Sequence, residues 1–98
     1  MIGVNVTFQY DDDFDQARVI GIAENARGMF EGMPGLRFKF FTFDDTRHRA
    51  TNFYVWDTKE AAEGFFSEEL TERVTGLYGV APAIDFVEIA QIVDNASS

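Results

Sequence analysis

The sequence contains no cysteine and only a few basic residues. The lack of cysteine excludes disulfides, thiolate metal sites and a cysteine nucleophile. Eight lysines and arginines stand against seventeen aspartates and glutamates, which gives a formal net charge of −9 at pH 7. Nucleic acids and anionic membrane surfaces attract basic proteins, so this charge argues against either as a partner.

Long apolar runs and cofactor motifs are also missing from the sequence. No apolar run is long enough to span a bilayer, and Met1–Tyr10 lacks the basic start and apolar stretch of a signal peptide. We therefore expect a cytoplasmic protein. The sequence has no glycine-rich phosphate loop, nucleophile elbow or zinc-binding pattern, so we expect neither a cofactor nor a bound metal.

Aromatic residues, in contrast, are abundant. Eleven Phe, three Tyr and one Trp make up 15% of the 98 residues. A chain of this length forms one domain, 1–98, with a modest core, and such a core absorbs only some of these rings. The remaining aromatic side chains must fill a subunit interface, a ligand cavity or both.

Hydrophobic periodicity predicts four strands and two helical regions. Alternation of apolar and polar residues, bounded by turn residues, indicates strands over 2–10, 36–43, 49–56 and 83–93. Apolar residues three and four apart indicate a helix over 14–30 and a second helical region over 57–79, broken near 67–69. In the second strand, the alternation places Leu36, Phe38 and Phe40 on one face, and Lys39 and Phe41 on the other.

Polar residues mark the predicted ends of these helices. Asp57 and Glu60 form a capping-box pattern, and Ser67 is a candidate N-cap for the second piece of the broken region. The acidic run 11–15 lacks the spacing and the glycine of a calcium-binding EF-hand, so we interpret it as capping for the first helix. Glycines 32, 35, 76 and 79 favour helix ends.

The resulting order of elements, β-α-β-β-α-β, predicts an α+β fold of the ferredoxin-like type. Right-handed crossovers fold this order into a four-stranded antiparallel sheet with both helical regions on one face. The other face stays open, and a single layer does not leave many aromatic side chains in water. We therefore expect a homodimer in which two sheets pack against each other.

Three segments of the chain resemble one protein family. Pro34–Thr42, Arg47–Ala50 and Phe53–Trp56 are similar to YdhR-type monooxygenases, which belong to the dimeric α/β-barrel (ABM-like) superfamily. The resemblance runs over nearly the whole chain. It implies cofactor-free oxygenation of aromatic, phenol-like molecules that bind between the sheet and the helices of each subunit. It also implies a site with an Asn and a Trp four residues apart on the third strand, as Asn52 and Trp56 are here.

The third strand therefore carries the first group of candidate site residues, Asn52, Tyr54 and Trp56, which share one face. The amide of Asn52 can hold an oxyanion or a peroxide oxygen, Trp56 can stack on a flat substrate, and Tyr54 can bind a phenol. In the alternative interpretation, the aromatic side chains simply pack, and Asn52 bonds a neighbouring backbone group.

Residues of the hairpin and two further tyrosines complete the candidate set. His48 can accept a proton, and Arg37 can bind an anion; His48 can equally be a solvated turn residue. Arg37 belongs to a cluster of four cations with Lys39, Arg47 and Arg49, which can instead pair with acids such as Asp44, Asp45 and Asp85. Tyr10 and Tyr78 are candidates for the mouth of the cavity or for a subunit interface.

Two functions remain open from the sequence. One is a cofactor-independent monooxygenase that uses dioxygen to oxidise an aromatic or quinol-like small molecule. The other is a non-catalytic dimeric protein that binds a hydrophobic metabolite or a stress-response partner. An isomerase or a lyase on the same scaffold is a third possibility, because a fold does not determine a reaction.

Overall fold

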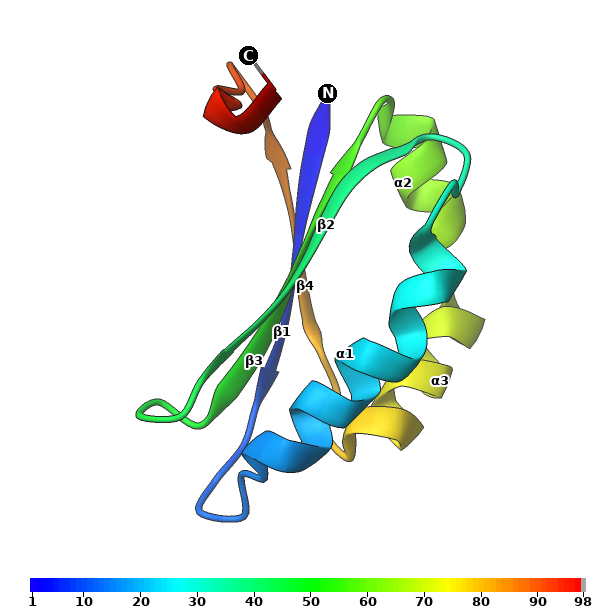
Figure 1. Ribbon diagram of the computed structural model, residues 1–98. Helices are drawn as coiled ribbons and strands as arrows, with labels where there is room; N and C mark the ends of the chain where they lie inside the picture. Colours follow the sequence, from blue (N-terminus) through cyan, green and yellow to red (C-terminus); the bar gives the residue numbers. More distant parts are fainter. Residues whose placement is uncertain (98) are drawn as a thin grey trace.

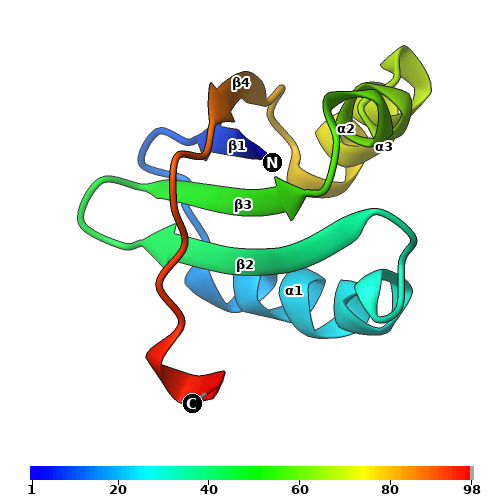
Figure 2. The ribbon, with the colours of Figure 1, turned by 90° about the horizontal axis from the view of Figure 1, so that it is seen from above.

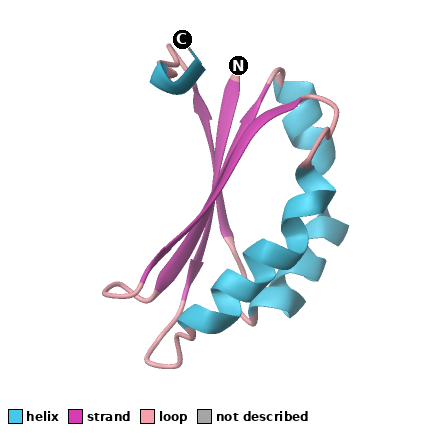
Figure 3. Cartoon of the chain, in the orientation of Figure 1, coloured by secondary structure: helices cyan, strands magenta, loops and turns pink. Residues whose placement is uncertain are grey.

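The computed structural model describes residues 1–97 and shows one antiparallel sheet with helices on a single face (Figures 1 and 3). The four strands lie in the order β2-β3-β1-β4, which confirms the predicted ferredoxin-like topology. The break expected in the second helical region divides it into two helices. The elements are β1 (Ile2–Gln9), α1 (Gln16–Phe30), β2 (Leu36–Asp44), β3 (Arg49–Trp56), α2 (Lys59–Phe65), α3 (Glu68–Tyr78), β4 (Ala83–Glu88) and a short 3-10 turn, Asn95–Ser97.

The core lies between the helices and the two central strands. Even-numbered residues of β1 face the helices, and Val4 and Phe8 are fully buried. Their partners on β3 share that face, because β1 pairs Val4 with Tyr54 and Phe8 with Ala50. We call this side the helix face of the sheet and the opposite side its outer face. Alternation thus places Asn52, Tyr54 and Trp56 on one face, as predicted, and the structure shows that this is the helix face.

An irregularity in β2 changes which of its residues face the helices. Leu36 pairs with Trp56 while Phe38 pairs with Val55, so one additional residue, Arg37, lies between them. Such a bulge reverses the alternation. Leu36 therefore packs against the core, opposite to its predicted grouping with Phe38. Lys39 still lies on the helix face, next to Tyr54.

The three longer helices begin at capping residues, one of which differs from the predicted one. Asp15 accepts a hydrogen bond from the backbone N–H of Arg18 and caps α1, as one member of the acidic run. Thr58, not Asp57, caps α2, because the helix begins one residue later than predicted, at Lys59; the Asp57 carboxylate forms an ion pair with Arg37. Ser67 caps α3 as predicted.

The last strand is shorter than predicted. It ends at Glu88, which pairs with Ile2, and the backbone N–H of Ile89 makes one further bond to the carbonyl of Met1. The segment 89–94 crosses over β3 and β2, on the side away from the helices (Figures 1 and 2).

None of the helices within residues 1–97 is long and apolar enough to cross a membrane.

A substitution at the C-terminus of α3 tests how the helix ends next to Tyr78. Gly79 ends the helix in the left-handed region, with φ of 86°. We expect Gly79→Ala to lower the free energy of unfolding by about 1 kcal/mol, because a side chain is strained at that φ. Gly76→Ala is the matched control within α3, where nothing lies within 4 Å of the added carbon.

The control substitution should raise the free energy of unfolding by about 0.5 kcal/mol, because alanine favours a helix over glycine. Urea unfolding curves measure both effects. Two changes of the same sign would contradict the proposed role of Gly79 as a cap.

Candidate functional site

A cavity of about 330 Å³ lies between the helix face of the sheet and helices α1 and α3. Its walls are mainly apolar: Phe30 and Met29 come from α1, Phe41 from β2, and Leu70 and Val74 from α3. The polar side chains on the walls include Asn52 and Tyr54 of β3, Lys39 of β2 and Tyr78 of α3. The sheet and the ends of two helices thus enclose a few polar groups in an apolar space, as ligand pockets commonly do.

Asn52 and Tyr78 form one polar pair at the floor of the cavity. Asn52 is 5% exposed, and its Nδ2 donates a hydrogen bond of 3.0 Å to the hydroxyl of Tyr78. The Tyr78 ring stacks on Phe8 with 3.7 Å between the ring centroids. Burial raises the pKa of Tyr78, and the bond from Asn52 offsets part of that increase. The Tyr78 phenol is therefore neutral at physiological pH and can donate its hydrogen to a ligand.

Lys39 and Tyr54 form a second polar pair. The Nζ atom of Lys39 donates a hydrogen bond of 2.6 Å to the Tyr54 hydroxyl. It also lies 3.6 Å from the ring centroid of Phe30, 4.3 Å from that of Phe41 and 3.9 Å from that of Tyr54. Aromatic faces attract a cation, so this cage compensates in part for the loss of water around the ammonium group.

Burial shifts the pKa values of Lys39 and Tyr54 in the directions that favour their uncharged forms. Desolvation lowers the pKa of Lys39 from 10.5 to about 7. Desolvation also raises the pKa of Tyr54, to which the nearby Tyr78 adds a smaller contribution. Tyr54 is therefore a neutral phenol, while Lys39 exchanges between ammonium and amine near neutral pH.

The structure brings three of the predicted site residues to the cavity, namely Asn52, Tyr54 and Tyr78. It places Trp56 deeper in the core, 2% exposed, with its ring 6.1 Å from that of Tyr54 and 5.2 Å from that of Phe65. The indole Nε1 of Trp56 has no hydrogen-bond partner among the described residues. Trp56 therefore supports Tyr54 from behind and does not line the cavity.

The other three candidates lie elsewhere. His48 lies in the hairpin turn, with φ of 54°, and its ring stacks on Phe14 at 5.9 Å. The hydroxyl of Tyr10 donates a 2.7 Å bond to the backbone oxygen of Tyr78, outside the cavity wall. Arg37 is exposed, and its Nε lies 3.5 Å from the carboxylate of Asp57.

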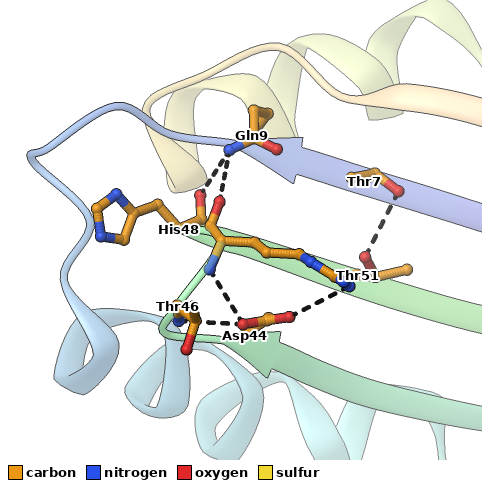
Figure 4. Close-up of polar contacts among 7 residues, drawn as sticks. Thr7, Gln9, Asp44, Thr46, His48 and Thr51 are labelled. Carbon is orange, nitrogen blue, oxygen red and sulfur yellow. Dashed lines mark hydrogen bonds and ion pairs between the residues drawn. The ribbon is translucent and has the colours of Figure 1, made fainter.

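The hairpin turn is held by its own polar contacts (Figure 4). Asp44 accepts bonds from the backbone N–H groups of Thr46 and Arg47, and its carboxylate lies 3.7 Å from the Arg47 guanidinium. The side chain of Gln9 donates to the backbone oxygens of Arg47 and His48, while the His48 ring points away from this network. These contacts pair Arg47 with Asp44, as the alternative interpretation expected. The neighbouring Arg49 differs, because its buried Nε has no hydrogen-bond partner among the described residues.

Sequence reasoning counted Lys39 among the hairpin cations and missed its place in the site. The other lysine of the chain, Lys59, is exposed at the start of α2. The available signal was the pattern Phe38-Lys39-Phe40-Phe41, in which one cation alternates with aromatic residues. That pattern does not say which face of the strand the helices cover, and only the structure shows this.

The chain resembles several solved structures over most of its length. It matches a monooxygenase from the gene ActVA-Orf6 of Streptomyces coelicolor, solved with nanaomycin D, at 18% identity and a TM-score of 0.72, covering 97% of this chain and 92% of the other. It matches a protein of unknown function from Nitrosomonas europaea at 13% identity and a TM-score of 0.73, covering 97% and 94%. No protein-family model and no curated protein matches the sequence.

A third similar structure is a mutant of SnoaB, a cofactor-independent oxygenase of Streptomyces nogalater. It has 13% identity and a TM-score of 0.63, covering 94% of each chain. Identities this low show the fold and not the reaction. The chain therefore has the fold seen in structures of antibiotic biosynthesis monooxygenases.

The lowered pKa of Lys39 predicts how stability depends on pH. Between about pH 7 and the ordinary lysine pKa of 10.5, the unfolded chain holds a proton on Lys39 that the folded chain has released. Stability therefore increases with pH in this window, by at most about 1.4 kcal/mol per pH unit. In Lys39→Met this contribution is lost.

The measurement is urea unfolding of wild type and Lys39→Met from about pH 6.5 to about pH 10, a range set by the two lysine pKa values. The difference between the two proteins isolates Lys39 from other titrating groups. Lys59→Met removes an exposed lysine and should leave the pH dependence of wild type intact. A difference that stays constant with pH would show that the buried amine keeps an ordinary pKa.

Proposed function

We propose that the protein is a cofactor-independent monooxygenase that uses dioxygen to oxidise an aromatic or quinol-like small molecule. The observation that carries the proposal is the cavity itself, an apolar space with an amide, two neutral phenols and an amine on its walls. The fold of the antibiotic biosynthesis monooxygenases supports it. The motif segments Pro34–Thr42 and Phe53–Trp56 favour the YdhR-type branch of that fold.

The reaction that such a site can promote starts from the substrate itself. A hydroxyarene that loses its hydroxyl proton becomes an electron-rich anion, which passes one electron to dioxygen. Recombination forms a C–O bond to a ring carbon, and the peroxide anion takes up a proton. That carbon then loses its hydrogen as a proton while the O–O bond breaks, so hydroxide and a proton leave as water. One hydroxyarene and one dioxygen thus become one quinone and one water.

The protein's contribution in this mechanism is to position and desolvate the reactants. One N–H of the Asn52 amide is used by Tyr78, and the second is left to donate to the developing peroxide oxygen. Tyr54 and Tyr78 hydrogen-bond the oxygens of the substrate. Trp56 acts as a positioning residue, because its ring packs behind Tyr54. We assign no part of the reaction to His48, Arg37 or Tyr10.

Oxygen uptake tests this function. Metal-free protein should consume dioxygen with at least one member of a panel of hydroxylated anthracenes and naphthols, and should release the matching quinone. We expect Asn52→Ala to lower kcat by about 100-fold, the usual cost of removing one donor to a developing oxyanion. Gln16→Ala removes an exposed amide at the start of α1 and is the control, with unchanged activity.

No oxygen uptake across the panel would contradict the proposal. A ligand that copurifies with the protein and stays unchanged under oxygen, with Asn52→Ala weakening only its affinity, would instead establish the non-catalytic binding protein.

We also propose that the protein works as a homodimer, closed through the outer faces of two sheets. The outer face carries Phe38, Phe40 and Val87, which are 37%, 53% and 42% exposed. The segment after β4 lies over part of this face but leaves a gap of about 650 Å³ against Phe38, Phe40, Phe53 and Val55. A second sheet at the usual packing distance of about 10 Å would fill that gap and cover the exposed rings.

Sedimentation equilibrium tests the assembly at micromolar concentration. Wild type should be a dimer, and Phe40→Asp should be a folded monomer, because it introduces a charge into the proposed interface. Phe43→Asp is the matched control: Phe43 is 42% exposed on the same strand but pairs with Ala50 on the helix face. A monomeric wild type, or a dimer that survives Phe40→Asp, would rule out this interface.

A further inference from the structure

The charged residues on the cavity wall are basic, although the chain as a whole is acidic. The chain has seventeen acidic residues and eight lysines and arginines. Of the described residues that line the cavity, two are cations, Lys39 and Arg73, and none is Asp or Glu. Although the chain is acidic, the described wall of its apolar cavity therefore carries two cations and no carboxylate.

Lys39 has no carboxylate to balance it. The ion pairs recorded within residues 1–97 join Arg27 to Glu31, Arg37 to Asp57 and Arg47 to Asp44, and none includes Lys39. Among the described residues, its Nζ contacts the Tyr54 hydroxyl and three aromatic faces and no carboxylate. A buried charge without a counter-charge is costly, and an ion that binds there recovers part of that cost.

The other ionisable groups around Lys39 do not supply the missing negative charge. Tyr54 of β3 and Tyr78 of α3 are phenols kept neutral by burial, and Arg73 of α3 is itself a cation. On its other side, Lys39 borders a surface groove that includes Glu31. The Glu31 carboxylate is 68% exposed and lies 3.6 Å from Arg27, so it is already paired and solvated.

We propose that the cavity selects an anionic planar molecule, an aromatic carboxylate or an acidic hydroxyarene, whose charged oxygen pairs with the Lys39 ammonium. The apolar walls bury the rings, and Lys39 sits where the charged oxygen would be desolvated. Arg73 is exposed on α3 and attracts the anion toward the opening. This inference rests on the cavity of the proposed function and adds the charge of its ligand, but it requires no turnover.

A pairing of this kind couples binding to a proton. A bound anion favours the ammonium form and raises the pKa of Lys39 above the value of about 7 that burial sets in the empty site. Above about pH 7, each binding event therefore takes up a proton, and the affinity for the anion decreases by up to about tenfold per pH unit. A neutral ligand of the same shape shows no such dependence.

The experiment uses two ligands that carry no oxidisable hydroxyl, 2-naphthoate and its uncharged counterpart 2-naphthamide. Isothermal titration at about pH 6.5, where Lys39 is mostly protonated, should show at least about tenfold tighter binding of 2-naphthoate to wild type. At about pH 8.5, titrations in buffers of different ionisation enthalpy should show uptake of a proton with 2-naphthoate only.

Two lysine variants and one matched control separate Lys39 from the rest of the site. Lys39→Met should bind both naphthalenes with equal affinity and without proton uptake. Lys39→Arg should keep the preference for 2-naphthoate but lose its pH dependence, because a guanidinium stays charged. Lys59→Met, which removes the exposed lysine of α2, should behave as wild type.

Equal affinity of wild type for the two ligands, or a preference for 2-naphthoate that survives Lys39→Met, would overturn the inference. The result is independent of oxygen uptake. A charge preference that depends on Lys39, in a protein that consumes no oxygen, would keep the anion site and reject the monooxygenase.

Discussion

The geometry of the site depends on one residue, Tyr78, which ties the end of α3 to the middle of the sheet. Its ring stacks on that of Phe8 with 3.7 Å between the centroids, and its hydroxyl accepts a hydrogen bond from the amide of Asn52. Its backbone oxygen accepts a hydrogen bond from the hydroxyl of Tyr10, which directly follows β1. These contacts hold the last turn of α3 against the sheet, while the cavity separates the earlier turns of α3 from β2 and β3. The cavity occupies the space that this arrangement leaves.

Large aromatic side chains keep that space open. The rings of Phe30, Tyr54 and Phe65 lie 5.8 to 5.9 Å from one another, in tilted or edge-to-face arrangements. All three rings line the cavity, and each packs against the other two in geometries that aromatic pairs prefer. The aromatic excess in the composition therefore has two uses here. Some rings form the core around Trp56, and others form the cavity wall around Lys39.

Much of the fold follows from local chemistry that the sequence displays. Alternation predicted β1 and β3, and the break before α3 was visible because Ser67 interrupts an apolar helical pattern. The end of β4 could not be predicted, because it depends on pairing with β1, which is a contact between distant segments. The bulge after Leu36 is equally non-local, since it shows only in the pairing with β3.

The site was predictable only in part, for the same reason. The period of two placed Asn52 and Tyr54 together, but it could not show that Trp56 lies behind Tyr54 and away from the cavity. Nor could it show that His48 points out of the hairpin turn. Lys39 was the largest omission, since its importance comes from burial and from the rings of α1 and β3 around it.

The two helices on either side of the break contribute differently to the core and the cavity. Helix α2 places Ala62 in the core, fully buried, and sets Phe65 and its C-cap Phe66 against Trp56, while Phe65 also reaches the cavity wall. Helix α3 presents Leu70, Val74 and Leu77 to the cavity, and these side chains are only partly buried or exposed. Val74 also packs against the core, whereas Leu77 is 48% exposed, so little of its surface is removed from water. The exposed end of α3 is therefore the part of the cavity wall that can vary in size and polarity while the core around Trp56 is kept.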